Sequence, residues 1–315
     1  MGLTIGIDVG GTKVLAGVVD ADGTVIAQAR RDTPADDVGR TRELIVDVIR
    51  ELSAAHPVDA VGIGAAGWID AQRSTVLYAP NLAWRHEPLR DSVAADIDLP
   101  VVVENDANAA AWAEFRFGAG QGTDSLVLLT VGTGIGGGIV LAGNLVRGEH
   151  GIAAEFGHTL AVADGHPCGC GARGCLEQYT SGTALVRYAR AAVRDGGTGP
   201  AAELLALVGG DVDKIDGPTV TRAARDGDPT ARAAFAEIGR WLGYGMADAV
   251  QILDPAVIVV GGGVSEAGEL LLDPARRAYA DRLTQRGKLP VAEIRQARLG
   301  NLAGLVGAAD LARRP

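Results

Sequence analysis

The chain has 315 residues, of which 47% are hydrophobic and 22% charged, a composition typical of a globular protein with a sizeable core. Its net charge of -10 and its lack of long basic runs argue against nucleic acid or an anionic membrane as the main partner. No stretch is long and apolar enough to span a membrane, and the first residues do not resemble a secretory signal. We therefore expect a cytoplasmic protein.

The N-terminal part of the chain predicts a sheet with helices. Residues 3–9 read as a buried strand, Gly10-Gly11 as a turn, and residues 12–19 as a second strand. Further strands are expected at 24–29, 58–65 and 100–103. Apolar residues at helical spacing predict a helix over 37–55, and another follows at 106–117.

Residues 125–146 repeat the opening pattern of strand, glycine turn, strand, turn and strand. The second glycine turn is Gly132-Thr133-Gly134. Two glycine hairpins can arise by chance in a chain with 45 glycines, but the repeat favours duplication of one pattern over a single doubly wound sheet. The remainder is mostly helical. A helix is expected at 229–252 with Asp228 as its N-cap, and others at 266–282 and 302–313; strands are expected at 256–260 and 291–295.

The first glycine turn has the residue types of a phosphate site. Backbone N–H groups at Gly10 and Gly11 can approach a phosphate without interference from a Cβ atom. Asp8, Thr12 and Lys13 beside them suit a magnesium nucleotide. The turn is not a Walker A loop, because no helix follows it. A simple hairpin with a solvated lysine is the alternative, but the presence of later glycine clusters favours phosphate binding.

Polar residues crowd the end of the strand expected at 100–103, namely Glu104, Asn105, Asp106 and Asn108. A helix N-cap would explain one of them. It would not explain all of them. A carboxylate at this place can accept the proton of an alcohol that attacks phosphorus, and a neighbouring amide can orient the same alcohol.

The three cysteines lie close together, at Cys168, Cys170 and Cys175, and His158 precedes them. One imidazole and three thiolates match a tetrahedral zinc site whose complete ligand set indicates a structural ion. An odd and clustered set argues against a disulfide framework. A strained disulfide between Cys168 and Cys170, or inert buried thiols, are the alternatives.

Together these motifs resemble those of the ROK family, named for its repressors, open reading frames and kinases. The cysteine run is similar to the family's Cys-x-Cys-Gly-x-x-Gly-Cys-x-Glu signature, and the motifs at 8–13, 105–106, 155–158 and 261–263 follow the family's order. The similarity covers essentially the whole chain and is greatest to bacterial glucokinases, especially those of actinobacteria. The family's repressors carry an N-terminal helix-turn-helix, which we do not expect here because the first strand begins at residue 3.

The resemblance implies a duplicated ribonuclease H-like α/β fold of the actin, hexokinase and Hsp70 type, with an active site between two lobes and a zinc-binding loop at 158–177. We expect an N-terminal lobe at 1–120 that includes a C-terminal helix at 301–315, and a C-terminal lobe at 121–300. The implied partners are a hexose and ATP with Mg²⁺. A homodimer or homotetramer is also expected, with no nucleic-acid or membrane partner.

The resemblance also implies roles for individual residues, with Asp106 as the catalytic base. The residues that match sugar-binding positions are Gly67, Asn105, Asp106, Glu155, His158 and Glu177. Those that match ATP-binding positions are Asp8, Gly10, Gly11, Thr12, Lys13, Gly132, Thr133, Gly134, Gly262 and Gly263. The zinc ligands would be His158, Cys168, Cys170 and Cys175, so that His158 would serve both the metal and the sugar.

The activity implied is transfer of the γ-phosphoryl group of ATP to the 6-hydroxyl of glucose. Kinases for fructose, N-acetylmannosamine or N-acetylglucosamine are alternatives, because a few contacts at the 2- and 4-positions of the sugar decide among them. A non-catalytic sugar sensor is a further alternative. The presence of Asp8, Lys13 and Asp106 argues against it, because a sensor has no need of phosphoryl-transfer groups.

Overall fold

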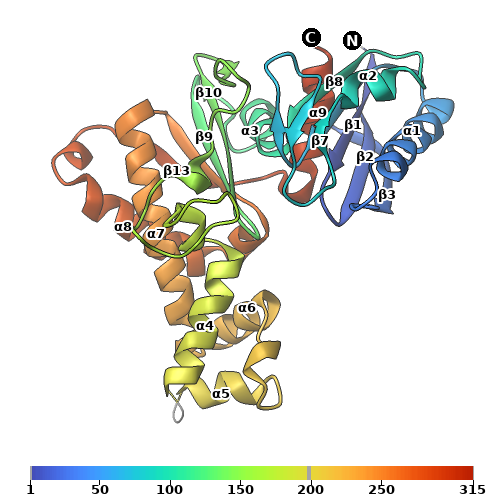
Figure 1. The fold of residues 1–315 in the computed structure, drawn as a ribbon. Helices are drawn as coiled ribbons and strands as arrows, with labels where there is room; N and C mark the ends of the chain where they lie inside the picture. The colour runs from blue at the N-terminus through green and yellow to red at the C-terminus, as the bar shows by residue number, and fades with distance from the viewer. Residues whose placement is uncertain (1, 197–199, 315) are drawn as a thin grey trace. The chain divides into compact units, whose positions relative to one another are not determined.

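The structure is a computed structural model that describes residues 2–196 and 200–314. The described residues form two compact units (Figure 1). Unit 1 comprises 2–128, 137–154 and 297–314, and unit 2 comprises 129–136, 155–196 and 200–296. The lobes expected at 1–120 with 301–315 and at 121–300 include residues outside the described part and stay a prediction. Within the described part, no helix is long and apolar enough to cross a membrane.

Unit 1 is built on a sheet whose strands are β1 (Leu3–Val9), β2 (Lys13–Val19), β3 (Val25–Asp32), β4 (Val58–Ala65) and β8 (Val101–Asn105). Their order is β3-β2-β1-β4-β8, with β1, β4 and β8 parallel and β2 and β3 antiparallel. Ile7, Ile63 and Val103 in the parallel strands are fully buried, as expected for a sheet covered on both faces. The parallel strands bring their carboxyl ends to one edge of the sheet.

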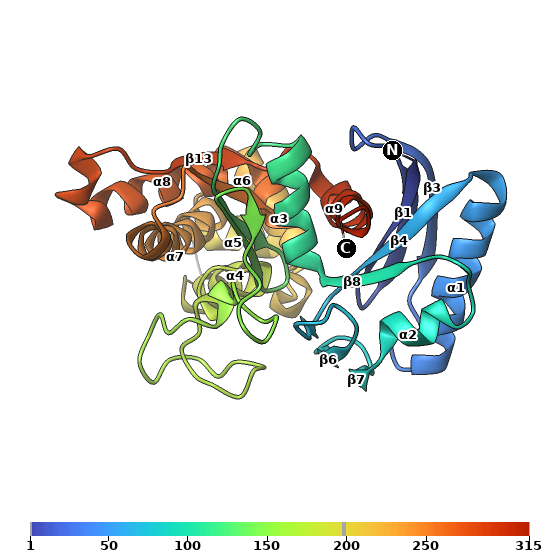
Figure 2. The same ribbon diagram turned by 90° about the horizontal axis from the view of Figure 1, so that it is seen from above.

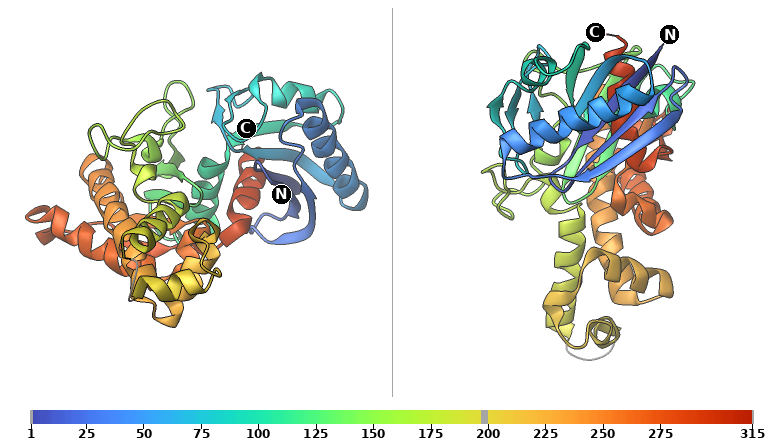
Figure 3. Two further views of the ribbon diagram at one scale, coloured as in Figure 1. Left: turned by 60° about the horizontal axis from the view of Figure 1, so that its bottom comes forward. Right: turned by 90° about the vertical axis from the view of Figure 1, so that its right-hand side faces the viewer.

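Helices cover both faces of this sheet. Helix α1 (Val38–Ala55) lies on one face and α9 (Ala303–Ala312) on the other (Figures 2 and 3). Helix α9 approaches the strands closely because Gly6 and Gly62 have no side chain. A Cβ atom there would lie 1.9 Å from the carbonyl oxygen of Leu305 and 1.8 Å from that of Ala308, respectively. Helix α3 (Asp106–Phe117) packs against α9.

Unit 1 also contains smaller elements. They are helix α2 (Leu89–Ala94) and a short sheet of β5 (Trp68–Ile69), β6 (Val76–Tyr78) and β7 (Arg85–Glu87). The backbone of Tyr78 in β6 packs against Gly67, in the loop that follows β4. The small sheet therefore supports a segment at the carboxyl edge of the main sheet.

A second sheet repeats the strand order of the first. Its strands are β9 (Leu126–Val131), β10 (Ile135–Leu141), β11 (Asn144–Leu145), β12 (Val257–Gly261) and β13 (Glu293–Gln296). Their order is β11-β10-β9-β12-β13, which corresponds strand by strand to β3-β2-β1-β4-β8. The boundary between the units crosses β9 and β10. The common order confirms that one α/β pattern occurs twice.

The helices of unit 2 are α4 (Gly182–Gly196), α5 (Pro200–Ala206), α6 (Gly217–Asp226), α7 (Pro229–Leu253) and α8 (Glu269–Leu283). Helix α4 packs against α5, α6 and α7 (Figure 1). Asp228 caps α7 by accepting a hydrogen bond from the backbone N–H of Ala231, as its sequence position predicts. The helix predicted at 266–282 was wrong at its start. A 3-10 helix ends at Ala267, and Gly268, with φ of 62°, separates it from α8.

Candidate functional site

Asp8 and Asp106 lie at the carboxyl edge of the sheet in unit 1. Strand β4 lies between β1, which contains Asp8, and β8, which ends just before Asp106. The register places Asp8 opposite Gly64 and Gly64 opposite Glu104. Burial raises the pKa of Asp8 to about 7; the negative charge of Asp106 adds to this increase, and Lys13 opposes it. Burial also raises the pKa of Asp106 to about 6. A carboxylate with a pKa near neutrality suits proton transfer.

Asn105 joins the start of α3 to the loop after β4. Its Oδ1 atom accepts a hydrogen bond from the backbone N–H of Asn108 at 2.9 Å, which caps the helix. Its Nδ2 atom donates to the carbonyl oxygen of Gly67 at 3.0 Å and to Oδ1 of Asp106 at 3.2 Å. Gly67 has no room for a side chain, since a Cβ atom would lie 2.4 Å from the carbonyl oxygen of Tyr78. The structure thus brings Gly67, Asn105 and Asp106 together.

The first glycine turn connects β1 to β2. The backbone N–H of Gly10 donates to the carbonyl oxygen of Lys13 at 3.0 Å, and the hydroxyl of Thr33 donates to the carbonyl oxygen of Gly10 at 2.8 Å. A Cβ atom on Gly11 would lie 2.8 Å from the backbone oxygen of Asn81, so packing requires that glycine. Among the described residues, a Cβ atom on Gly10 would meet only the Lys13 oxygen, at 3.6 Å. Protein packing therefore does not explain why residue 10 is a glycine.

The second glycine turn, at 132–134, connects β9 to β10 and lies beside the glycine cluster Gly261-Gly262-Gly263. The backbone N–H of Gly182, at the start of α4, donates to the carbonyl oxygen of Gly132 at 2.7 Å. Gly262 has φ of 82°, and a Cβ atom there would lie 2.5 Å from the carbonyl oxygen of Val131. A Cβ atom on Gly132 would have no protein atom of the described residues within 4 Å.

A cavity of about 1060 Å³ lies in unit 2, against the second glycine turn and against the glycine cluster at 261–263. Gly132, Thr133 and Gly263 line it, together with helices α4 and α6. Its volume is sufficient for a nucleotide. The sequence analysis missed the arginines of its lining, which are Arg187, Arg190, Arg194, Arg222 and Arg225. Their only signal is helical spacing, which a solvated helix face shares.

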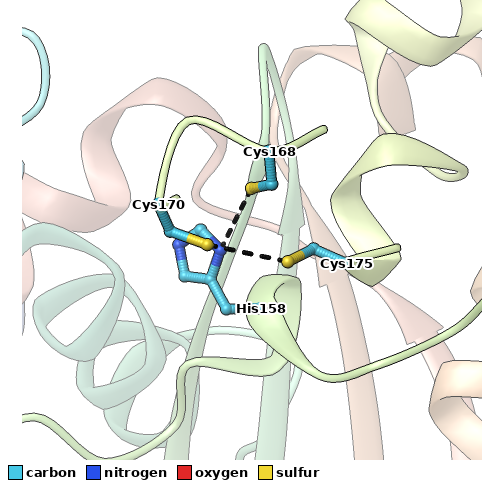
Figure 4. A group of neighbouring side chains, drawn as sticks. All are labelled: His158, Cys168, Cys170 and Cys175. Carbon is cyan, nitrogen blue, oxygen red and sulfur yellow. Dashed lines mark hydrogen bonds between the residues drawn. The ribbon is translucent and has the colours of Figure 1, made fainter. Parts of the chain in front are cut away.

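His158, Cys168, Cys170 and Cys175 form a cluster in unit 2 (Figure 4). Their donor atoms all lie within 4.8 Å of one another. The Sγ atom of Cys168 is 3.7 Å from Nδ1 of His158, and the Sγ atoms of Cys170 and Cys175 are 3.6 Å apart. Tetrahedral zinc with bonds of about 2.3 Å holds its ligands about 3.8 Å apart, so the donor set fits this ion. All three cysteines are free thiols, which excludes the disulfide alternative in this structure.

The cysteine cluster is continuous with Glu177 and with the second glycine turn. The thiol of Cys168 donates to Oε1 of Glu177 at 3.0 Å. A Cβ atom on Gly134 would lie 2.4 Å from Oε2 of the same carboxylate. The Nε2 atom of His158 lies 3.8 Å from Oε2 of Glu155 and faces away from the sulfur atoms. The His158 ring therefore lies between the sulfur atom of Cys168 and the carboxylate of Glu155.

The sites predicted from the sequence divide between the units. Unit 1 holds the first glycine turn with Asp8, Lys13, Gly67, Asn105 and Asp106. Unit 2 holds the second glycine turn, Gly262, Gly263, Glu155, His158, Glu177 and the three cysteines. Sequence analysis also missed Arg73 and Arg147, which pair with Glu104. Arg73 and Arg147 lie far from Glu104 in the sequence, and their spacing does not indicate that they pair with it.

Comparison with known proteins agrees with these observations. The sequence model of the ROK family matches residues 4–315. The chain is 52% identical to the glucokinase of Streptomyces coelicolor, covering 100% of this chain and 99% of that one, and 37% identical to the glucokinase of Thermotoga maritima, covering 98% and 96%. A solved ROK family glucokinase from Streptomyces griseus in complex with glucose and AMPPNP matches with a TM-score of 0.90 and 52% identity over 100% of both chains. The chain therefore belongs to the ROK family and has the mixed α/β fold of its two-lobed sugar kinases.

Proposed function

We propose that this protein is an ATP-dependent glucokinase, which phosphorylates glucose at the 6-hydroxyl and releases ADP. The observation that carries the proposal is the partly buried carboxylate of Asp106, whose pKa is about 6 and which lies beside Asn105 at the start of α3. Glucose is favoured over other hexoses because the two Streptomyces relatives, each 52% identical to this chain, are glucokinases.

Asp106 is the general base of the proposed reaction. It takes the proton of the 6-hydroxyl as the sugar oxygen bonds to the γ-phosphorus and the bond from that phosphorus to the bridging oxygen of ADP breaks. We assign the orientation of the sugar to Asn105 and to the loop at Gly67. We assign the binding of sugar hydroxyls to Glu155, His158 and Glu177, because carboxylate and imidazole groups suit them.

We assign phosphate binding to the two glycine turns. Backbone N–H groups of the turns at 10–12 and at 132–134 suit phosphate oxygens, and Lys13 supplies a positive charge. The adenosine occupies the cavity beside Gly262 and Gly263. Asp8 is the residue that would hold Mg²⁺ or its waters, since carboxylate oxygens suit this ion, which neutralises charge on the transferring phosphoryl group when bound.

His158, Cys168, Cys170 and Cys175 would hold one zinc ion. The ligand set is complete, so the ion is structural and supplies no open position for a substrate. Burial raises the pKa of the Cys168 and Cys175 thiols, and a bound zinc ion would favour their thiolate forms. The metal loop carries His158 and ends next to Glu177, so it fixes the geometry of both residues.

A coupled assay of ADP formation tests the proposed function. The assay should contain ATP and Mg²⁺ and compare four sugars as substrates: glucose, fructose, N-acetylmannosamine and N-acetylglucosamine. Phosphorus NMR should identify the product. We expect the highest kcat/KM with glucose and a 6-phosphate product. Hexose binding without hexose-dependent ADP formation would instead support the sugar sensor. We further propose a cytoplasmic homodimer or homotetramer that acts in glycolysis, with light scattering as the test of its mass.

A further inference from the structure

Glu104 is a buried charge that the proposed reaction does not use. It precedes Asn105 in β8, and its side chain is only 1% exposed. Its Oε2 atom forms ion pairs with Nε of Arg147 at 2.7 Å and with Nε of Arg73 at 3.2 Å. Apolar side chains of similar volume often stabilise a core as well as a buried ion pair does. The presence of charge here therefore calls for a reason beyond stability.

The other oxygen of Glu104 contacts the residues on either side of Asp106. Oε1 accepts hydrogen bonds from the backbone N–H of Asn105 at 2.9 Å and from Nδ2 of Asn108 at 3.1 Å. Asn105 in turn caps the backbone N–H of Asn108. Asp106 lies in the segment between Asn105 and Asn108, which share this carboxylate oxygen as their acceptor. A movement of that oxygen therefore shifts the start of α3 on both sides of Asp106.

Arg147 anchors the same carboxylate to a distant part of unit 1. Its Nη1 and Nη2 atoms donate to the carbonyl oxygens of Ala71 and Asp70, each at 2.8 Å. The carbonyl oxygen of Arg73 accepts a hydrogen bond from the backbone N–H of Val103 at 3.1 Å. The network thus fixes the end of β8 against the turn after β5 and against the segment after β11.

We propose that Glu104, held by Arg147, is a positioning residue that places Asn105 and Asp106 for sugar orientation and proton transfer. The inference rests on the proposed kinase function. Without the carboxylate, the N–H of Asn105 and the amide of Asn108 lose their acceptor, and two guanidinium groups lose their counter-ion. Displacement of reacting groups by about 1 Å can cost about 10²-fold in rate.

Glu104→Gln is the primary test, because it keeps one oxygen acceptor and removes the charge. We expect kcat to fall about 10- to 100-fold and the KM for glucose to rise, while the KM for ATP stays within about twofold of wild type. Arg147→Met should show the same pattern more weakly. Because the two residues act through one contact, the double variant should lose less activity than the product of the two single losses.

Asp310→Asn is the matched control in the same unit. Asp310 is also a buried carboxylate, 3% exposed, with its Oδ2 atom 3.4 Å from Nε of Arg116 and 2.8 Å from Nε1 of Trp112. It contacts none of the residues assigned to sugar or base. The control should have wild-type kcat and KM values for each folded molecule, even where its Tm falls.

The proposal is wrong if Glu104→Gln behaves like this control, or if it raises the KM for ATP as much as the KM for glucose. If Glu104→Gln does not fold, Arg147→Lys replaces it, since lysine keeps the charge but has one nitrogen atom in place of the three that contact the two carbonyls and the carboxylate. An unchanged kcat in that variant would also overturn the proposal. Wild-type protein that phosphorylates no hexose refutes the proposed function itself, whereas active wild type with unaffected variants refutes only the positioning role.

Discussion

The carboxylates of Asp8 and Asp106 are electrostatically coupled. Burial raises the pKa of Asp8 to about 7, and the negative charge of Asp106 contributes to the increase. Two acidic groups held close together in a partly buried place oppose each other's ionisation, and the folded protein bears that cost at neutral pH. The pair is therefore expected to lower stability while serving the reaction.

Asp8→Asn should stabilise the protein in a pH-dependent way. The folded-state pKa of about 7 lies above the ordinary value of 3.8, so the folded state loses stability as pH rises from about 4 to about 7. Asparagine carries no charge and removes this loss, with a gain of up to about 4 kcal/mol at pH 8. Thermal unfolding should show a larger Tm increase at pH 8 than at pH 5. Asp47→Asn, on the exposed face of α1, is the control and should leave the Tm unchanged at both pH values. Equal Tm shifts for Asp8→Asn at pH 5 and pH 8 would contradict a raised pKa for Asp8.

Asp106→Asn should abolish phosphorylation while glucose binding is largely retained. The amide keeps the size of the side chain but cannot take a proton, and loss of a general base costs about 10²–10⁴-fold. In the wild type, kcat/KM for glucose should fall as pH drops below about 6, because the base becomes protonated. Steady-state kinetics and calorimetric titration with glucose check both expectations. Retention of more than about a tenth of wild-type kcat would remove Asp106 from this role.

Gly10→Val and Gly132→Ala should raise the KM for ATP far more than that for glucose. In the part of the chain that the structure describes, neither new Cβ atom meets a protein atom closer than 3.6 Å, so both variants should fold, while their side chains block approach of a phosphate to the backbone. Gly39→Ala in α1 is the control, since its Cβ atom would meet a single oxygen of the described residues, at 3.5 Å. Equal increases in both KM values, with unchanged Tm, would mean that the turns do not bind the nucleotide.

Cys170→Ala should lower the zinc content and weaken glucose affinity, with much less effect on ATP. The wild type should hold about one zinc per chain in its Cys₃His set. Removal of one ligand loosens the loop that carries His158 and Glu177. Plasma mass spectrometry and glucose titration measure the two effects. His166→Ala is the control, because this exposed histidine lies in the same loop but outside the cluster. Metal-free protein with full glucose affinity would refute the coupling.

The sequence by itself determined the local elements and the identity of most candidate site residues. Strands at 3–9 and 58–65 and helices at 106–117 and 229–253 follow from apolar runs, helical spacing and caps, which are properties of neighbouring residues. The cysteine cluster could also be predicted, because its ligands are near one another in the chain. The glycine repeat indicated duplication, which the common order of the two sheets confirms.

Tertiary structure alone decided which distant residues share an environment. Asp8 and Asp106 interact because β1, β4 and β8 are parallel and end at one edge, and no sequence spacing states that register. Glu104 meets Arg147 and Arg73 only after three remote segments are folded together. The pKa of Asp8 likewise depends on burial and on a charge 98 positions away in the sequence. The periodicity of apolar residues predicts which residues share a face of one helix or strand. Electrostatic interactions and hydrogen bonds depend on distance in space, which only the folded chain defines.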